Sequence, residues 1–107
     1  MPNSFTMEYD LAGRTAKEIY AKVSQVKTIG KMTLDFEQPE ETRMIYVQPT
    51  TVWKDGFKAL VVFHDHEGGS VHVAIRSQCN RSMVIFDGGQ NEKNCVAIRN
   101  AIAAALK

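Results

Sequence analysis

Residues 57–79 read FKALVVFHDHEGGSVHVAIRSQC, and the pairing between the two halves of this stretch decides the fold. The turn residues EGG separate two runs rich in β-branched and aromatic side chains, which predicts a hairpin of two long strands, 57–66 and 70–79. Side chains alternate between the two faces of a strand. A loop longer or shorter by one residue therefore changes which side chains of the two strands share a face. The loop length therefore determines which side chains form the core.

A three-residue loop, Glu67-Gly68-Gly69, buries the larger apolar set and is the length that we expect, as a type I turn closed by one left-handed glycine. It places His64 opposite His72 and Val62 opposite Ala74 on one face. A loop of two or four residues would instead turn histidines toward the core. With three residues, the core face of the hairpin carries Val61, Phe63, Val71, Val73 and Ile75.

The residues outside the hairpin predict a single α+β domain over residues 1–107. Alternation and short apolar runs indicate further strands, and a period near 3.6 residues indicates two helices. Short connections imply an antiparallel sheet of five to six strands with both helices packed on one face, in the order β-α-β-β-β-β-β-α. The expected strands are 4–10, 31–37, 42–48 and 83–86, and the expected helices are 15–30 and 92–106.

Local signals mark the ends of the two helices. Thr15 and Glu18 have the spacing of a capping box, and Gly30 is expected to end the first helix. Asn91 is the expected N-cap of the second helix. The core stripe of that helix is expected to comprise Cys95, Ile98, Ile102 and Leu106.

The connection at 38–41 is expected to be a four-residue loop between two strands. This loop places Leu34 opposite Ile45 on the core face. Met44 and Tyr46 then lie on the face that the helices leave open. An apolar band with polar groups at its edge is typical of small-molecule sites and of partner surfaces. The candidate binding face comprises Met44, Tyr46, Lys58, Leu60, Val62, His64 and Arg76.

All three histidines of the chain, His64, His66 and His72, share this open face if the loop has three residues. Three converging imidazoles resemble the ligand set of a catalytic zinc ion with one open position. We interpret the histidines first as exposed residues of a hairpin, and we keep a zinc site as the alternative. No nucleophile pattern accompanies them, so no catalytic residue is assigned.

Composition and charge argue against several classes of function. The chain has 13 Lys and Arg residues and 12 Asp and Glu residues, for a net charge of +1. This balance gives no overall positive potential that would attract nucleic acid or an anionic membrane. No apolar run approaches the roughly 20 residues that span a bilayer. Residues 1–10 lack the pattern of a signal peptide. Cys79 and Cys95 stand in no metal-ligand spacing, so we expect reduced thiols in a cytoplasmic protein.

The second half of the chain carries three short motifs: GFKALVVF (56–63), GGSVHVAIRSQ (68–78) and DGGQNEKNCVAIRNAIAAAL (87–106). With these motifs it resembles the bacterial and plastid domain-of-unknown-function family fourteen-ninety-nine. The stretch CNRSMVIF (79–86) and the histidines depart from the family pattern. The resemblance implies an α+β domain with two helices and no particular activity, because the family has no established chemistry.

These patterns predict a non-enzymatic module that binds a small ligand or a protein through its open face. The alternatives are a metal-dependent enzyme built on the three histidines and a structural subunit that forms a homodimer through the same face. The turn DGGQN (87–91) is interpreted as a chain reversal rather than an anion site. Trp53 is interpreted as a plug at the end of the core.

Overall fold

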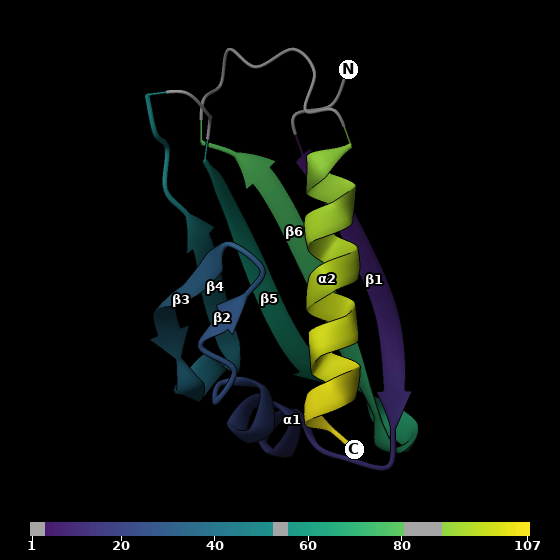
Figure 1. The fold of residues 1–107 in the computed structure, drawn as a ribbon. Coiled ribbons are helices and arrows are strands. Elements are labelled where there is room, and N and C mark those ends of the chain that lie inside the picture. Colours follow the sequence, from purple (N-terminus) through teal and green to yellow (C-terminus); the bar gives the residue numbers. More distant parts are fainter. Residues whose placement is uncertain (1–3, 53–55, 81–88) are drawn as a thin grey trace.

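The computed structural model describes residues 4–52, 56–80 and 89–107. A six-stranded antiparallel sheet runs behind the long helix α2, and the short helix α1 lies at one end of the same face (Figure 1). The predicted α+β class is thereby confirmed. The expected strand 83–86 and Trp53 lie outside the described residues. The elements are β1 (Ser4–Ala12), α1 (Ala16–Val23), β2 (Thr28–Ile29), β3 (Met32–Gln38), β4 (Arg43–Gln48), β5 (Phe57–Asp65), β6 (Ser70–Cys79) and α2 (Gln90–Ala105).

The strand order across the sheet is β1-β6-β5-β4-β3-β2, so both strands of the β5–β6 hairpin lie in the interior of the sheet. The hairpin has the predicted three-residue loop, and His64 lies opposite His72. Gly68 and Gly69 both adopt positive φ, at 82° and 80°, in place of the single left-handed glycine that a type I turn predicts. The predicted core face is confirmed, since its five side chains are at most 1% exposed.

Helix α1 begins as predicted but ends earlier. The Thr15 hydroxyl accepts a hydrogen bond from the Glu18 backbone N–H at 3.2 Å. The carboxylate of Asp65, at the end of β5, accepts from the Ala16 N–H at 2.8 Å and so ties the helix start to the hairpin. The predicted continuation to Gly30 is wrong, because the helix ends at Val23.

The residues after α1 form a short strand instead of two further helical turns. Thr28 and Ile29 are β-branched, which favours extended backbone, and they pair with β3. Gly30 has a φ of 62° and opens the two-residue turn that joins Ile29 to Met32. Strand β2 thus becomes one edge of the sheet.

The predicted register between β3 and β4 is wrong. A bulge at Asp35 places Leu34 opposite Tyr46 and Phe36 opposite Ile45. The bulge moves Phe36 to the open face, where it is 46% exposed. The connection is a 3-10 turn over Pro39–Glu41 followed by Thr42 in the left-handed conformation, with a φ of 49°.

Helix α2 is held over the sheet by an apolar stripe and a buried polar cluster. Its predicted stripe is confirmed, since Cys95, Ile98 and Ile102 are at most 1% exposed and Leu106 packs against the core. The predicted N-cap role of Asn91 is wrong, because Gly89 occupies that position. The buried Asn91 instead accepts a hydrogen bond from the Ser77 hydroxyl of β6 at 2.8 Å, and Asn94 donates to the same hydroxyl at 3.1 Å.

Candidate functional site

The candidate site is the face of the sheet opposite the helices, which we call the open face. Strand register assigns its side chains, because residues directly opposite one another on paired strands share a face. The rows, read from β1 toward β3, are Asp10–His72–His64, Glu8–Ala74–Val62–Arg43–Gln38, Thr6–Arg76–Leu60–Ile45–Phe36 and Ser4–Gln78–Lys58–Val47–Thr33.

An apolar strip crosses the middle of the open face. No helix among the described residues packs on it, since the buried cluster of α1 and α2 lies against the opposite side chains. Lys58 is exposed at its border and contacts no carboxylate among the described residues. Phe36 is exposed and the other members are half-buried; the apolar strip comprises Phe36, Ile45, Val47, Leu60 and Val62.

Two residues predicted for this face lie in the core instead. Met44 and Tyr46 are fully buried, on the side that packs against the helices. The Tyr46 hydroxyl donates a hydrogen bond to the Val26 carbonyl at 2.7 Å. Ile45 and Val47 take the places on the open face that the sequence assigns to Met44 and Tyr46. The register does place Lys58, Leu60, Val62, His64 and Arg76 together on the open face, as predicted.

The hairpin end of the open face carries a cluster of imidazoles and carboxylates. The His72 ring lies between two carboxylates of β1, with Nδ1 2.9 Å from Asp10 Oδ1 and Nε2 2.8 Å from Glu8 Oε1. The His66 ring stacks on the His72 ring at 5.3 Å between centroids, and His64 meets His66 edge to face at 5.8 Å. Sequence reasoning missed Glu8 and Asp10, although their i, i+2 spacing places both on the outer face of a strand.

The two contacts of His72 define its charge in this arrangement. An ionised carboxylate only accepts hydrogen bonds, and a neutral imidazole has one N–H, so bonding to both carboxylates requires the imidazolium. The hydrogen bonds from Glu8 and then Asp10 accordingly raise the pKa of His72 above its usual value. We call this arrangement the His72 clamp; it links the edge strand β1 to β6.

The His72 clamp should make the stability of the domain depend on pH. Because the native pKa of His72 is raised, the clamp contributes fully below the unfolded value of about 6.5, and its contribution is lost as pH rises through the native pKa. We therefore expect His72→Gln to lower the urea midpoint at about pH 6 and to have a smaller effect at about pH 9. The measurement is urea unfolding of both proteins across this range.

The control for this pH experiment is Glu8→Gln, which keeps the side-chain shape and removes one charge from the clamp. An NMR titration should show the pKa of His72 lower in this variant than in the wild type. A difference between wild type and His72→Gln that grows as pH rises would contradict the clamp.

The geometry of the histidines does not resemble a preformed zinc site. The lone pair of an imidazole nitrogen lies in the ring plane, and the His66 and His72 planes are only 9° apart, so their nitrogens do not converge on one point. Within the described residues, no three His, Cys, Asp or Glu side chains are placed to hold a metal ion. Zinc binding by His64, His66 and His72 stays a prediction, which a calorimetric zinc titration against the triple His→Ala variant tests.

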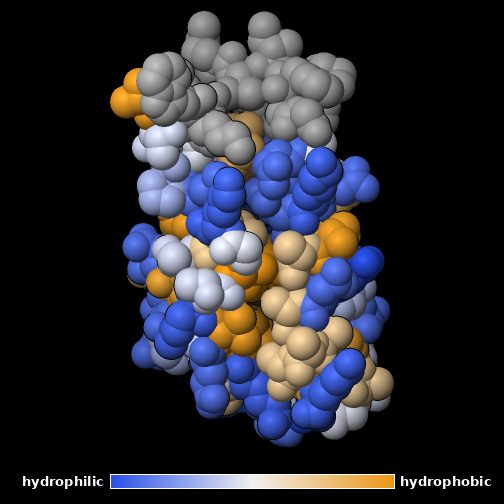
Figure 2. Space-filling model, viewed as in Figure 1, coloured by the Kyte–Doolittle hydropathy of each residue, from blue (hydrophilic) through white to orange (hydrophobic). Residues whose placement is uncertain are grey.

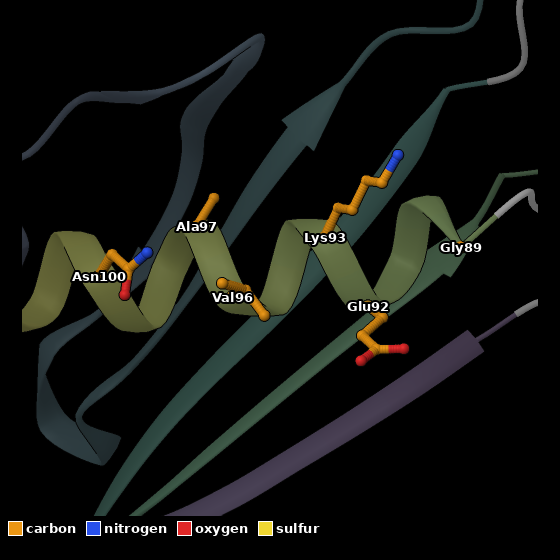
Figure 3. Close-up of a pocket in the computed structure, with 6 residues that line it drawn as sticks. All are labelled: Gly89, Glu92, Lys93, Val96, Ala97 and Asn100. Atoms are coloured by element: carbon orange, nitrogen blue, oxygen red, sulfur yellow. The ribbon is translucent and has the colours of Figure 1, made fainter.

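A hollow lies on the helix side of the molecule, away from the open face. A cavity of about 530 Å³ runs along the first part of α2, with Lys93 and Ala97 extending toward one side of the helix and Glu92 toward the other (Figure 3). Hydrophobic atoms are also visible on this side in the space between α2 and β2 (Figure 2). The cavity lining described is Gly89, Glu92, Lys93, Val96, Ala97 and Asn100. This cavity is an alternative place for a small ligand.

Three further observations bear on function. Among the described residues, no serine, threonine or cysteine side chain is hydrogen-bonded to a histidine, so the nucleophile–base pair of covalent catalysis is not assembled there. Cys79 and Cys95 are both reduced and buried. Over the same residues, no helix is both long and apolar enough to cross a membrane.

Comparison with known protein families finds no match, and comparison with curated proteins finds none either. The resemblance to domain-of-unknown-function family fourteen-ninety-nine therefore stays a prediction.

Solved structures do share the fold. An uncharacterised protein from Bacillus thuringiensis matches with a TM-score of 0.63 and 9% identity, over 96% of this chain and 95% of its own. The protein XoxI from Bacillus cereus matches with a TM-score of 0.63 and 9% identity, over 99% of this chain and 97% of its own. A protein from Thermus thermophilus, TTHA0849, matches with a TM-score of 0.54 and 11% identity, over 95% of each chain. At such identities the likeness shows the fold alone: a small α+β domain with a curled antiparallel sheet and two helices.

Proposed function

We propose that this domain is a non-enzymatic binding module that docks a partner protein on its open face. The observation that carries the proposal is the apolar strip, which crosses β3, β4 and β5 on the face away from both helices. An uncovered apolar patch rimmed by polar groups is typical of protein interaction sites. The strip lies on a sheet surface rather than in an enclosed cavity, which suits the broad surface of a protein.

The charges beside the strip indicate the chemistry of the partner. Arg43 is already bonded to Gln38 and paired with Glu41, and Glu8 and Asp10 are held by His72. Two cations beside Leu60, Lys58 and Arg76, have no acidic partner among the described residues. Arg76 is directed toward β1, where it donates to the Thr6 and Ser4 hydroxyls, so Lys58 is the cation at the border of the strip. A partner segment that alternates apolar and acidic side chains would cover the strip and pair with Lys58.

Binding can be tested with defined peptides and the isotope-labelled domain. The probe is a synthetic peptide that alternates Leu and Glu, and the matched control peptide alternates Leu and Lys. We expect the acidic peptide to shift the backbone amide signals of Ile45, Val47, Leu60 and Val62. Leu60→Glu should abolish these shifts, because it places a charge in the middle of the strip, whereas Thr33→Glu at the margin of the same face should keep most of them.

The outcomes of this experiment separate the competing sites. Shifts confined to Glu92, Lys93 and Ala97 would place binding in the α2 cavity and would overturn the proposal. Equal binding of the acidic and basic peptides would remove the role of Lys58 while keeping the open face. No shift with either peptide at any concentration reached would contradict a peptide-docking face.

A further inference from the structure

Strand β1 leaves one side of its backbone without a strand partner among the described residues. It is nine residues long and stands at the end of the sheet order, where β6 is its one neighbour among the strands that the structure describes. Within the same part of the chain, the other contact to its backbone is a weak bond from the Cys95 thiol to the Phe5 carbonyl at 3.5 Å. A long edge with free N–H and C=O groups is a template for pairing with a further strand.

The side chains of this edge are also incompletely covered. Phe5, Met7, Tyr9 and Leu11 point toward the helix side of the sheet, and all four are only half-buried. Their equivalents on β6, such as Val73 and Ile75, are fully buried. The difference arises because β6 has a neighbouring strand on each side and β1 has one. A strand added beside β1 would complete the burial of this row.

Arg76 supplies a charge that is directed toward the same edge. Its guanidinium reaches from β6 across β1, donating to the Thr6 hydroxyl at 3.3 Å and to the Ser4 hydroxyl at 3.4 Å. Both partners are neutral and the contacts are long, and no carboxylate among the described residues pairs with Arg76. A strand beside β1 that offered a carboxylate opposite Thr6 would provide the missing partner.

We propose that the strand added at this edge is β1 of a second copy of the chain, paired antiparallel about a two-fold axis at Met7. When β1 pairs with its own copy, the half-buried side chains of both copies must lie on the same face of the joined sheet. This holds only if the two-fold axis passes through a residue of the strand and not between two residues. A centre at Glu8 would set two Glu8 carboxylates directly opposite each other, which is unfavourable. A centre at Met7 instead sets Thr6 opposite Glu8 of the second copy.

The two-fold axis at Met7 satisfies both features of the edge at once. Arg76 of one copy, lying over Thr6, meets Glu8 of the second copy, which has one carboxylate oxygen bonded to its own His72 and the other left for Arg76. Phe5 of one copy lies opposite Tyr9 of the other on the helix side. The two six-stranded sheets join into one, with both open faces on the same side. The dimer would therefore present two apolar strips together, although it does not depend on what they bind.

Matched charge variants at Thr6 test the pairing in the whole chain. Thr6 is exposed, and in the dimer it lies opposite Glu8 of the second copy. We expect Thr6→Lys to tighten and Thr6→Glu to weaken dimerisation, each by about threefold to tenfold in the dissociation constant, because the contact occurs twice. Sedimentation equilibrium over a concentration series gives these constants.

The same two variants carry an internal control through fold stability. Within one copy, Thr6→Glu gives Arg76 a carboxylate partner and Thr6→Lys gives it a like charge. We therefore expect Thr6→Glu to stabilise the monomer while it weakens the dimer, and Thr6→Lys to do the reverse. A variant that simply folds less well would not give this opposite pattern. Wild-type protein that stays monomeric at NMR concentrations would overturn the proposal.

Cysteine cross-linking tests the position of the axis. Met7→Cys should form a disulfide-linked dimer under mild oxidation, because the two Met7 positions face each other at a Cα separation of about 5 Å. Leu11→Cys lies in the same half-buried row, but its two positions would be about 26 Å apart and should not cross-link. Equal cross-linking of both variants would overturn the proposed register. Dissociation by Leu60→Glu with no response to the Thr6 variants would show instead that two sheets stack face to face.

Discussion

Replacing Gly56 with alanine is expected to lower the free energy of unfolding by about 3 kcal/mol. A Cβ atom at this position would overlap the Gln48 carbonyl oxygen and would lie 2.5 Å from backbone atoms of Pro49 and Thr50. These atoms belong to the main chain and cannot rotate away as a flexible side chain would. The substitution should therefore separate the segment after β4 from the start of β5.

The position of Gly56 explains why this segment is so tightly packed. Its N–H donates to the Thr50 hydroxyl at 3.1 Å, and its carbonyl accepts from the Asn80 N–H at 3.0 Å. Gly56 thus holds the chain where β4, β5 and β6 meet at one end of the sheet. The absence of a side chain allows the two backbone segments to approach each other.

The control for Gly56 is Gly13→Ala, measured by urea unfolding in parallel. Gly13 has a φ of 81° and nothing within 4 Å of its added Cβ, so its substitution should cost only the backbone strain of about 1 kcal/mol. Equal stability of the two variants would contradict the close contact between Gly56 and the backbone of residues 48–50.

The second large effect is expected at Tyr46. Tyr46→Ala should lower the free energy of unfolding by about 4 kcal/mol, because a fully buried aromatic ring is removed from the core. Burial raises the pKa of Tyr46 to about 12, so the phenol stays protonated and donates to the Val26 carbonyl. Tyr46→Phe removes only this hydrogen bond and should cost about 1 kcal/mol.

The comparison variant for Tyr46 is Ile45→Ala, one residue away on the opposite face. Ile45 is half-buried in the apolar strip, so its truncation should cost about 1 kcal/mol. Thermal and urea unfolding of Tyr46→Ala, Tyr46→Phe and Ile45→Ala measure the loss of stability in each variant. A larger loss at Ile45 than at Tyr46 would mean that β4 faces the other way, as the sequence alone suggested.

The face of β4 shows where prediction from sequence fails. Residues 44–47 read MIYV, so both faces of this strand are apolar and alternation cannot choose between them. The choice depends on the neighbours: the bulge at Asp35 shifts β3 by one residue, and Tyr46 reaches the carbonyl of Val26, just after α1. Neither feature has a signal within the strand itself.

The hairpin shows the opposite case. In residues 61–75 the possible loop lengths differ sharply in folding free energy, because a loop of two or four residues would turn histidines toward the core and expose Phe63. A two-residue period and two glycines therefore suffice to predict the loop length, the register and the core face, all of which the structure confirms. The stripe of α2 was predictable for the same reason, since its apolar residues recur at helical spacing.

The sequence by itself determined the fold class, the central hairpin and the set of residues from β5 and β6 that share the open face. These follow from local periodicity, which acts between neighbours along the chain. Only the tertiary structure decided that Ile45 and Val47, rather than Met44 and Tyr46, complete that face. It also decided the His72 clamp, because Asp10 and His72 are 62 residues apart in the chain and meet only when β1 pairs with β6.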